Sequence, residues 1–93
     1  MKLSDVLQWV EQKLQQPFEP NNLFIVCIEA AIEENPYYTA SQCLERAGKL
    51  YQLNLQLAVQ GSGVHFRGVR LSDYSPGKEY LLARIGELMN LCL

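Results

Sequence analysis

Apolar residues recur every three to four positions near the start of the chain, which predicts an amphipathic helix. Ser4 is placed to cap this helix, so we expect it to run from Asp5 to about Gln16. Trp9 lies roughly 120° from the centre of the apolar stripe and therefore at its flank. The stripe is formed by Leu3, Val6, Leu7, Val10 and Leu14.

The next segment is apolar on almost every side, which predicts a central, mostly buried helix. Asn21 or Asn22 can cap it, and Asn35-Pro36 stops it after Glu34. Its apolar residues are Leu23, Phe24, Ile25, Val26, Cys27, Ile28, Ala30, Ala31 and Ile32.

A capping box from Thr39 to Gln42 predicts the start of a third helix, which we expect to reach about Gln52. This helix has the clearest division into an apolar and a polar face. The apolar arc is formed by Ala40, Cys43, Leu44, Ala47, Leu50 and Tyr51.

The hydrophobic period then changes from 3.6 to 2, which predicts a β-hairpin. We expect a strand there, because two sets of residues alternate: Leu53, Leu55, Leu57 and Val59 with Asn54, Gln56, Ala58 and Gln60. Gly61-Ser62-Gly63 is the expected turn, and residues 64–71 the second strand. Val69 and Leu71 are one residue out of phase with Val64 and Phe66, so we expect a bulge at Gly68.

Ser75 and Pro76 are typical of the first residues of a helix, and a wide apolar face follows them. The expected fold is therefore α+β: three helices, a β-hairpin and a C-terminal helix. This order of elements resembles the winged helix-turn-helix superfamily over Ser4 to Leu93. The resemblance implies that the helices Asn22–Glu34 and Ala40–Gln52 form the helix-turn-helix unit and that the hairpin is the wing. The resemblance rests on the order of the elements, and no residue motif supports it.

Composition is that of one ordered globular domain spanning residues 1–93. The hydrophobic fraction is 48% and the charged fraction 19%. No apolar stretch has the length of a membrane span or of a secretion signal, so we expect a cytoplasmic protein. The three cysteines have no paired spacing, and we expect buried reduced thiols.

Charge is unevenly distributed along the chain, although the total is only −2. Residues 46–72 carry four basic residues and no acidic one. The helix and hairpin of this region are therefore expected to share a positive, acid-free surface, as a recognition helix and a wing require for bases and phosphates. The candidate nucleic-acid-binding residues are Gln42, Arg46, Lys49, His65, Arg67 and Arg70.

Two other interpretations of the sequence stay open. The positive face can be merely solvated, since four cations are few and the chain as a whole is acidic. Alternatively the domain binds a protein partner or a second copy of itself through exposed aromatic residues and the last helix. The candidate interface residues are Trp9, Tyr37, Tyr38, Leu82 and Met89.

Other kinds of site find little support in the sequence. The glycines of residues 61–68 lack the lysine of a phosphate-binding loop and the third glycine of a dinucleotide fingerprint. His65 has no acidic residue between Glu45 and Asp73 to orient it as a general base. We therefore expect no cofactor, metal ion, small-molecule substrate or catalytic residue, and a protein that is not an enzyme.

Overall fold

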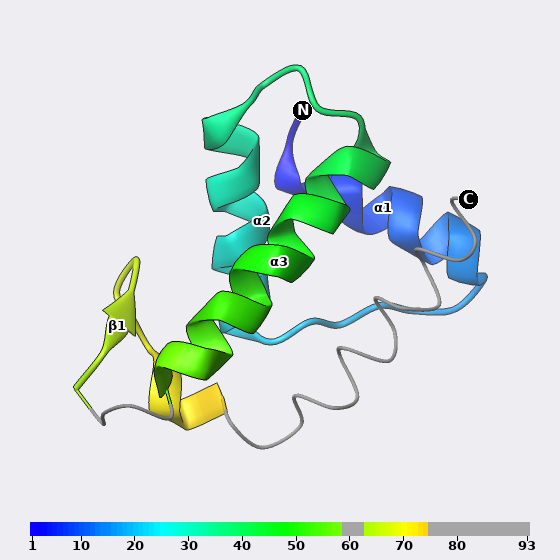
Figure 1. Ribbon diagram of the computed structural model, residues 1–93. Helices are drawn as coiled ribbons and strands as arrows, with labels where there is room; N and C mark the ends of the chain where they lie inside the picture. Colours follow the sequence, from blue (N-terminus) through cyan, green and yellow to red (C-terminus); the bar gives the residue numbers. More distant parts are fainter. Residues whose placement is uncertain (59–62, 75–93) are drawn as a thin grey trace.

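The computed structural model describes residues 1–58 and 63–74. Three helices are followed by a small antiparallel hairpin and one turn of 3-10 helix (Figure 1). The α+β class is confirmed, and the arrangement is compatible with a winged helix. The expected C-terminal helix after Ser75, with Leu82 and Met89, lies outside the described residues. The elements are α1 (Leu3–Leu14), α2 (Asn22–Glu34), α3 (Ala40–Ala58), β1 (His65–Phe66), β2 (Val69–Arg70) and η1 (Leu71–Tyr74).

The helix ends follow the capping residues of the sequence, with one correction. Helix α1 begins before Ser4, and the backbone N–H of Lys2 donates to the Asp5 carboxylate at 3.0 Å. Asn21 caps α2 by accepting a 2.9 Å hydrogen bond from the Phe24 backbone N–H. The predicted capping box of α3 is confirmed by reciprocal bonds between Thr39 and Gln42 at 3.0 and 3.2 Å.

Helix α3 continues through the segment expected to be the first strand of the hairpin, so that prediction is wrong for residues 53–58. Leucine and glutamine are good helix formers, whereas strands favour β-branched and aromatic residues. The apparent alternation arose because leucines lie on two different faces of one helix. Leu55 is buried in the core, whereas Leu53 and Leu57 are exposed.

The hairpin is shorter than predicted and turns at a different place. Phe66 pairs with Val69 and His65 with Arg70, so the turn consists of Arg67 and Gly68. Both turn residues have positive φ, 52° and 85°, as a tight type I′ hairpin turn requires. Gly68 is therefore a turn residue and not the predicted bulge.

The core lies mainly between α2 and α3, with α1 packed against both. Phe24 of α2 makes edge-to-face contacts with Phe18 and with Tyr51 of α3, at centroid distances of 6.1 and 5.3 Å. Leu71 is fully buried and attaches the end of the hairpin to this core. Burial of one such leucine contributes roughly 1.5–3 kcal/mol.

Candidate interaction site

Three of the expected nucleic-acid-binding cations are paired with carboxylates. Arg46 Nε lies 3.0 Å from Glu34 Oε2, and Arg67 Nη2 lies 2.6 Å from Glu33 Oε2. Lys49 Nζ lies 3.9 Å from Glu45 Oε1, one helical turn away. The expectation of an acid-free surface is therefore wrong.

The ion pairs of Arg46 and Arg67 form because α2 ends beside α3 and the hairpin. The last turn of α2 carries Glu33 and Glu34, which lie in the acidic part of the sequence but within reach of α3 and the hairpin. A block of basic residues in the sequence does not remain a block of positive charge when an acidic helix end packs beside it. The fold brings Glu34 to Arg46 and Glu33 to Arg67, whereas Glu45 lies one turn from Lys49 on α3 itself.

His65 and Arg70 differ from those cations. They are cross-strand partners in the hairpin, and both are exposed. His65 Nδ1 lies 3.0 Å from the Gly63 carbonyl oxygen. Within residues 1–58 and 63–74, neither side chain has an ion-pair partner. Among the described residues, the hairpin therefore keeps one exposed arginine, Arg70, that no carboxylate pairs with.

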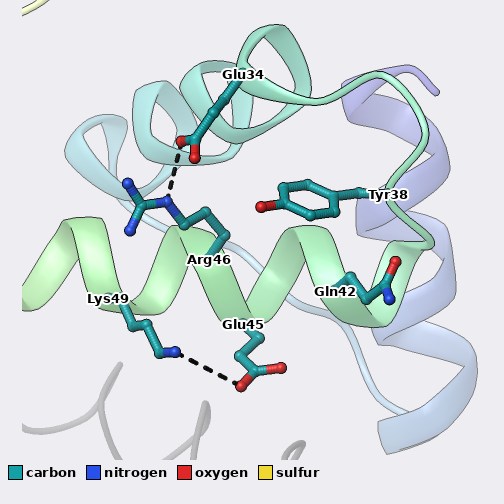
Figure 2. Close-up of a pocket in the computed structure, with 6 residues that line it drawn as sticks. All are labelled: Glu34, Tyr38, Gln42, Glu45, Arg46 and Lys49. Carbon is teal, nitrogen blue, oxygen red and sulfur yellow. Dashed lines mark hydrogen bonds and ion pairs between the residues drawn. The ribbon is translucent and has the colours of Figure 1, made fainter.

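A polar groove of about 500 Å³ lies between the end of α2, the connection after it and the first half of α3. Figure 2 shows Glu34 and Arg46 facing each other across it, with the Tyr38 ring beside them. Six side chains line this groove, two of them acidic and two basic: Glu34, Tyr38, Gln42, Glu45, Arg46 and Lys49. The groove thus unites three of the predicted site residues with Tyr38 from the second predicted set.

The connection between α2 and α3 positions both tyrosines. The Asn35 side chain accepts a 3.0 Å hydrogen bond from the Tyr37 backbone N–H, and its carbonyl accepts one of 3.3 Å from Tyr38. These bonds fold Asn35–Tyr38 into a tight turn. Tyr37 is left 91% exposed, whereas Tyr38 is half-buried and packs against the core beside the groove.

Trp9 is not part of this groove. It is half-buried against the core from α1, and the Lys13 ammonium lies 5.8 Å from its ring centroid. This cation–π contact covers part of the indole. Of the predicted partner-interface residues that the structure describes, Trp9, Tyr37 and Tyr38, only Tyr38 lines the groove.

The two described cysteines are buried free thiols, as predicted. Cys27 accepts a 3.6 Å hydrogen bond from the amide of Asn54, the buried polar side chain of α3. Burial raises the pKa of the Cys27 thiol from 9.0 to about 11, although the bond from Asn54 lowers it. Burial likewise raises the pKa of Cys43. Both thiols are therefore neutral, and they are not activated nucleophiles.

No group of three or more His, Cys, Asp or Glu side chains in residues 1–58 and 63–74 is arranged to hold a metal ion. None of the helices there is both long and apolar enough to cross a membrane.

Sequence reasoning missed Glu34, the acidic residue that faces Arg46 across the groove. Only the Glu45–Lys49 pair had a signal in the sequence, because residues four apart on a helix are neighbours. Glu34 is twelve residues from Arg46 and on another helix, so its position depends on helix packing.

Comparison of the chain with known protein families, with curated proteins and with solved structures gives no match. The likeness to a winged helix therefore rests on the order and arrangement of the described elements.

Proposed function

We propose that this protein is a non-enzymatic interaction module that binds a segment of a partner protein in the α2–α3 groove. The observation that carries the proposal is the pairing of Arg46 and Lys49 with Glu34 and Glu45 along the groove walls. A surface built to attract phosphates would not place two carboxylates beside its cations.

The composition of the groove favours a polypeptide over a small molecule. Small-molecule sites are mostly apolar and enclose their ligand, whereas this groove is lined by charged side chains that stay substantially exposed. Tyr38 and Arg46 belong to residue types that dominate the binding energy of protein interfaces. Tyr37, the neighbour of Tyr38 in the connection between α2 and α3, adds an exposed aromatic ring.

The charges define the kind of segment that fits. The long Lys49–Glu45 pair, at 3.9 Å, can exchange partners at little cost because both side chains are more than half exposed. A segment that carries one acidic and one basic side chain can therefore pair with Lys49 and Glu45 at once. The proposed ligand is a polar peptide with charges of both signs.

Selection from a random peptide library displayed on phage tests this proposal, with binding of the enriched peptides measured by fluorescence polarisation. We expect Arg46→Ala and Tyr38→Ala to weaken binding at least tenfold. Arg70→Ala is the matched control, because it removes an exposed arginine outside the groove and should leave affinity unchanged. Enriched peptides that bind Arg46→Ala as well as they bind the wild type would refute the groove as the site.

A second candidate function is nucleic-acid binding by the hairpin, and the exposed His65–Arg70 pair favours it. Titration with mixed-sequence duplex DNA at low and moderate salt tests this function, since phosphate contacts weaken as salt rises. Here the variants exchange roles: Arg70→Ala should weaken DNA binding and Arg46→Ala should not. Absence of binding at low salt would exclude this function.

A further inference from the structure

Arg46 lies in the wall of the groove, and Glu34 binds one edge of its guanidinium. The Nε–H of Arg46 donates to Glu34 Oε2 at 3.0 Å. Within residues 1–58 and 63–74, no hydrogen bond or ion pair engages Nη1 or Nη2 of this guanidinium. Figure 2 shows both terminal nitrogens on the side that faces away from Tyr38. The four N–H donors of the terminal nitrogens are therefore available to a ligand.

Arg67 and Arg70 are arranged differently. Glu33 accepts a 2.6 Å hydrogen bond from Nη2 of Arg67, so the terminal edge of that guanidinium is already engaged. Arg70 is exposed, and no carboxylate of residues 1–58 and 63–74 orients it. Of the three described arginines, Arg46 alone is both held by a carboxylate and open at its terminal edge.

The open edge of Arg46 has the geometry of a carboxylate site. Its terminal N–H groups are parallel donors in a planar fork, which matches the two oxygens of a carboxylate. The Arg46 side chain is 35% exposed, so this edge is partly shielded from water and can still be reached from it. Because the bond to Glu34 fixes the plane of the guanidinium, less side-chain freedom is lost when a ligand binds. Glu34 thus prepares Arg46 for a planar anion.

The charges around Arg46 favour a carboxylate over a phosphate. Two glutamates and two cations line the groove, so its formal charges balance. A phosphate monoester carries about −1.5 to −2 at neutral pH, and it would meet stronger repulsion from Glu34 and Glu45 than a carboxylate of charge −1. The anion that fits the open edge of Arg46 is therefore a single carboxylate.

We propose that the two terminal nitrogens of Arg46 bind the side-chain carboxylate of an aspartate or glutamate in the partner peptide, with Glu34 as the positioning residue. This inference rests on the peptide binding proposed above and deepens it by naming one required residue type of the ligand. The acidic residue at Arg46 is separate from the charges that pair with Lys49 and Glu45. Loss of the carboxylate, or of the fork that binds it, should weaken binding about tenfold, as expected for a charge-assisted contact.

Two matched libraries of short random peptides, displayed on phage, test this carboxylate site. Both exclude aspartate and glutamate, except that the central residue is glutamate in one library and glutamine in the other. Display through the C-terminus removes the terminal carboxylate as a second source of this group. We expect the full chain to enrich peptides from the glutamate library only. Enriched peptides are then synthesised with an amidated C-terminus and with either glutamate or glutamine at the centre, and fluorescence polarisation measures their affinities.

A double-mutant cycle locates the carboxylate. Arg46→Ala and the change of peptide glutamate to glutamine should each weaken binding about tenfold, and the two together should weaken it no further, since they remove the two halves of one contact. Arg46→Lys keeps the charge and loses the fork, so its preference for the glutamate peptide should be smaller than that of the wild type. Lys49→Ala is the control: it removes another cation of the groove and should keep the full preference.

Glu34→Gln and Glu34→Ala isolate the positioning role. Both remove the same charge, but only glutamine keeps an oxygen that can accept from the Arg46 Nε–H. Glu34→Gln should keep the preference for the glutamate peptide, whereas Glu34→Ala should lose about threefold of it because the guanidinium is no longer held. A general loss of structure would not change this ratio selectively, and circular dichroism verifies the fold of each variant.

Several outcomes would overturn the carboxylate site. Equal enrichment from both libraries, with binding that still depends on Arg46, would rule out the carboxylate and keep the groove as a peptide site. The same conclusion follows if the fully random library gives binders and these two libraries give none. Coupling of the glutamate to Lys49 instead of Arg46 would also overturn it, and equal preferences in Glu34→Gln and Glu34→Ala would rule out the positioning role. Absence of binders from every library would refute the peptide-binding function and this inference with it.

Discussion

Arg67 at the tip of the hairpin is joined to Glu33 in the last turn of α2, with 2.6 Å between guanidinium nitrogen and carboxylate oxygen. The two residues are 34 positions apart in the sequence. The contact ties the hairpin to the helical part of the molecule at its turn, while Leu71 ties it at its base. Arg67, a candidate phosphate-binding residue, thus joins two elements of the fold.

We predict that this ion pair is weak and sensitive to salt. A double-mutant cycle with Glu33→Gln and Arg67→Gln should give a coupling free energy below about 1 kcal/mol, because both side chains are substantially exposed. Urea unfolding at about 0.1 M and 1 M salt measures the coupling, which should decline at high salt. A coupling that is absent at low salt, or unchanged at high salt, would contradict this account.

The unfolding free energy should fall as pH rises from about 9 to about 11. In the folded chain the pKa of Cys27 is raised to about 11, whereas the unfolded thiol ionises near its ordinary value of 9.0. Over this interval the folded state keeps a proton that the unfolded state has lost, so alkali favours unfolding. The stabilisation is complete below pH 9 and is lost through this window, by about 2–3 kcal/mol for a shift of this size.

Cys43 and Tyr51 contribute in the same direction, because burial raises the pKa of both groups. Urea denaturation at pH 8 and at pH 10.5 measures the total effect. Cys27→Ala is the control and should show a shallower decline with pH. Equal slopes in the wild type and in Cys27→Ala would show that this thiol is not the main source of the pH dependence.

Asn21 links the start of α2 to α3, and its two functions can be separated. Its oxygen caps α2, and its Nδ2 donates a 3.0 Å hydrogen bond to the Tyr51 hydroxyl. Tyr51→Phe removes only the second bond and should cost about 1 kcal/mol. Asn21→Ala removes both bonds and should cost about 2 kcal/mol.

Asn21→Ser keeps a capping oxygen and loses the amide, so its cost should be intermediate in the wild-type background. In the Tyr51→Phe background the same change should cost less, since the bond is already gone. Thermal or urea unfolding measures the stability of the wild type, Asn21→Ser, Tyr51→Phe and the double variant. Additive costs would mean that the Asn21–Tyr51 bond contributes nothing to stability.

The extension of α3 beyond Gln52 predicts a strong effect of proline on an exposed residue. Gln56→Pro removes a helical hydrogen bond and clashes with the preceding turn, and it should cost about 3 kcal/mol. Gln56→Ala keeps the helix and should change stability by less than about 0.5 kcal/mol. Urea unfolding of the two variants distinguishes a helix from a tolerant loop, in which proline would have little effect.

Local patterns predicted the helices well where capping and periodicity agreed. The starts of α2 and α3 and the end of α2 follow Asn21, Thr39 and Pro36, because these residues act on the backbone immediately beside them. The prediction failed between residues 53 and 58. Leucines on the exposed side of a helix imitate the alternation of a strand, and the helical assignment depends on Leu55 and Asn54 reaching the core.

The candidate site was only half predictable for a related reason. Gln42, Arg46 and Lys49 share one side of a helix by spacing alone, and the groove contains all three. The electrostatic surroundings of Arg46 depend on Glu34, twelve positions earlier, and those of Arg67 depend on Glu33, 34 positions earlier. No local rule connects charges at that distance.

The amino-acid sequence alone was sufficient for the order of the three described helices, the caps of α2 and α3 and the two described buried thiols, since each depends on neighbouring residues. It also predicted a hairpin after the helices, but with its turn at residues 61–63 and not at Arg67-Gly68. Tertiary packing determined which charges meet, where the groove forms and which leucines remain on the surface. Those properties depend on how α2, α3 and the hairpin lie against one another, so a region that is basic in sequence became a surface of paired charges in space.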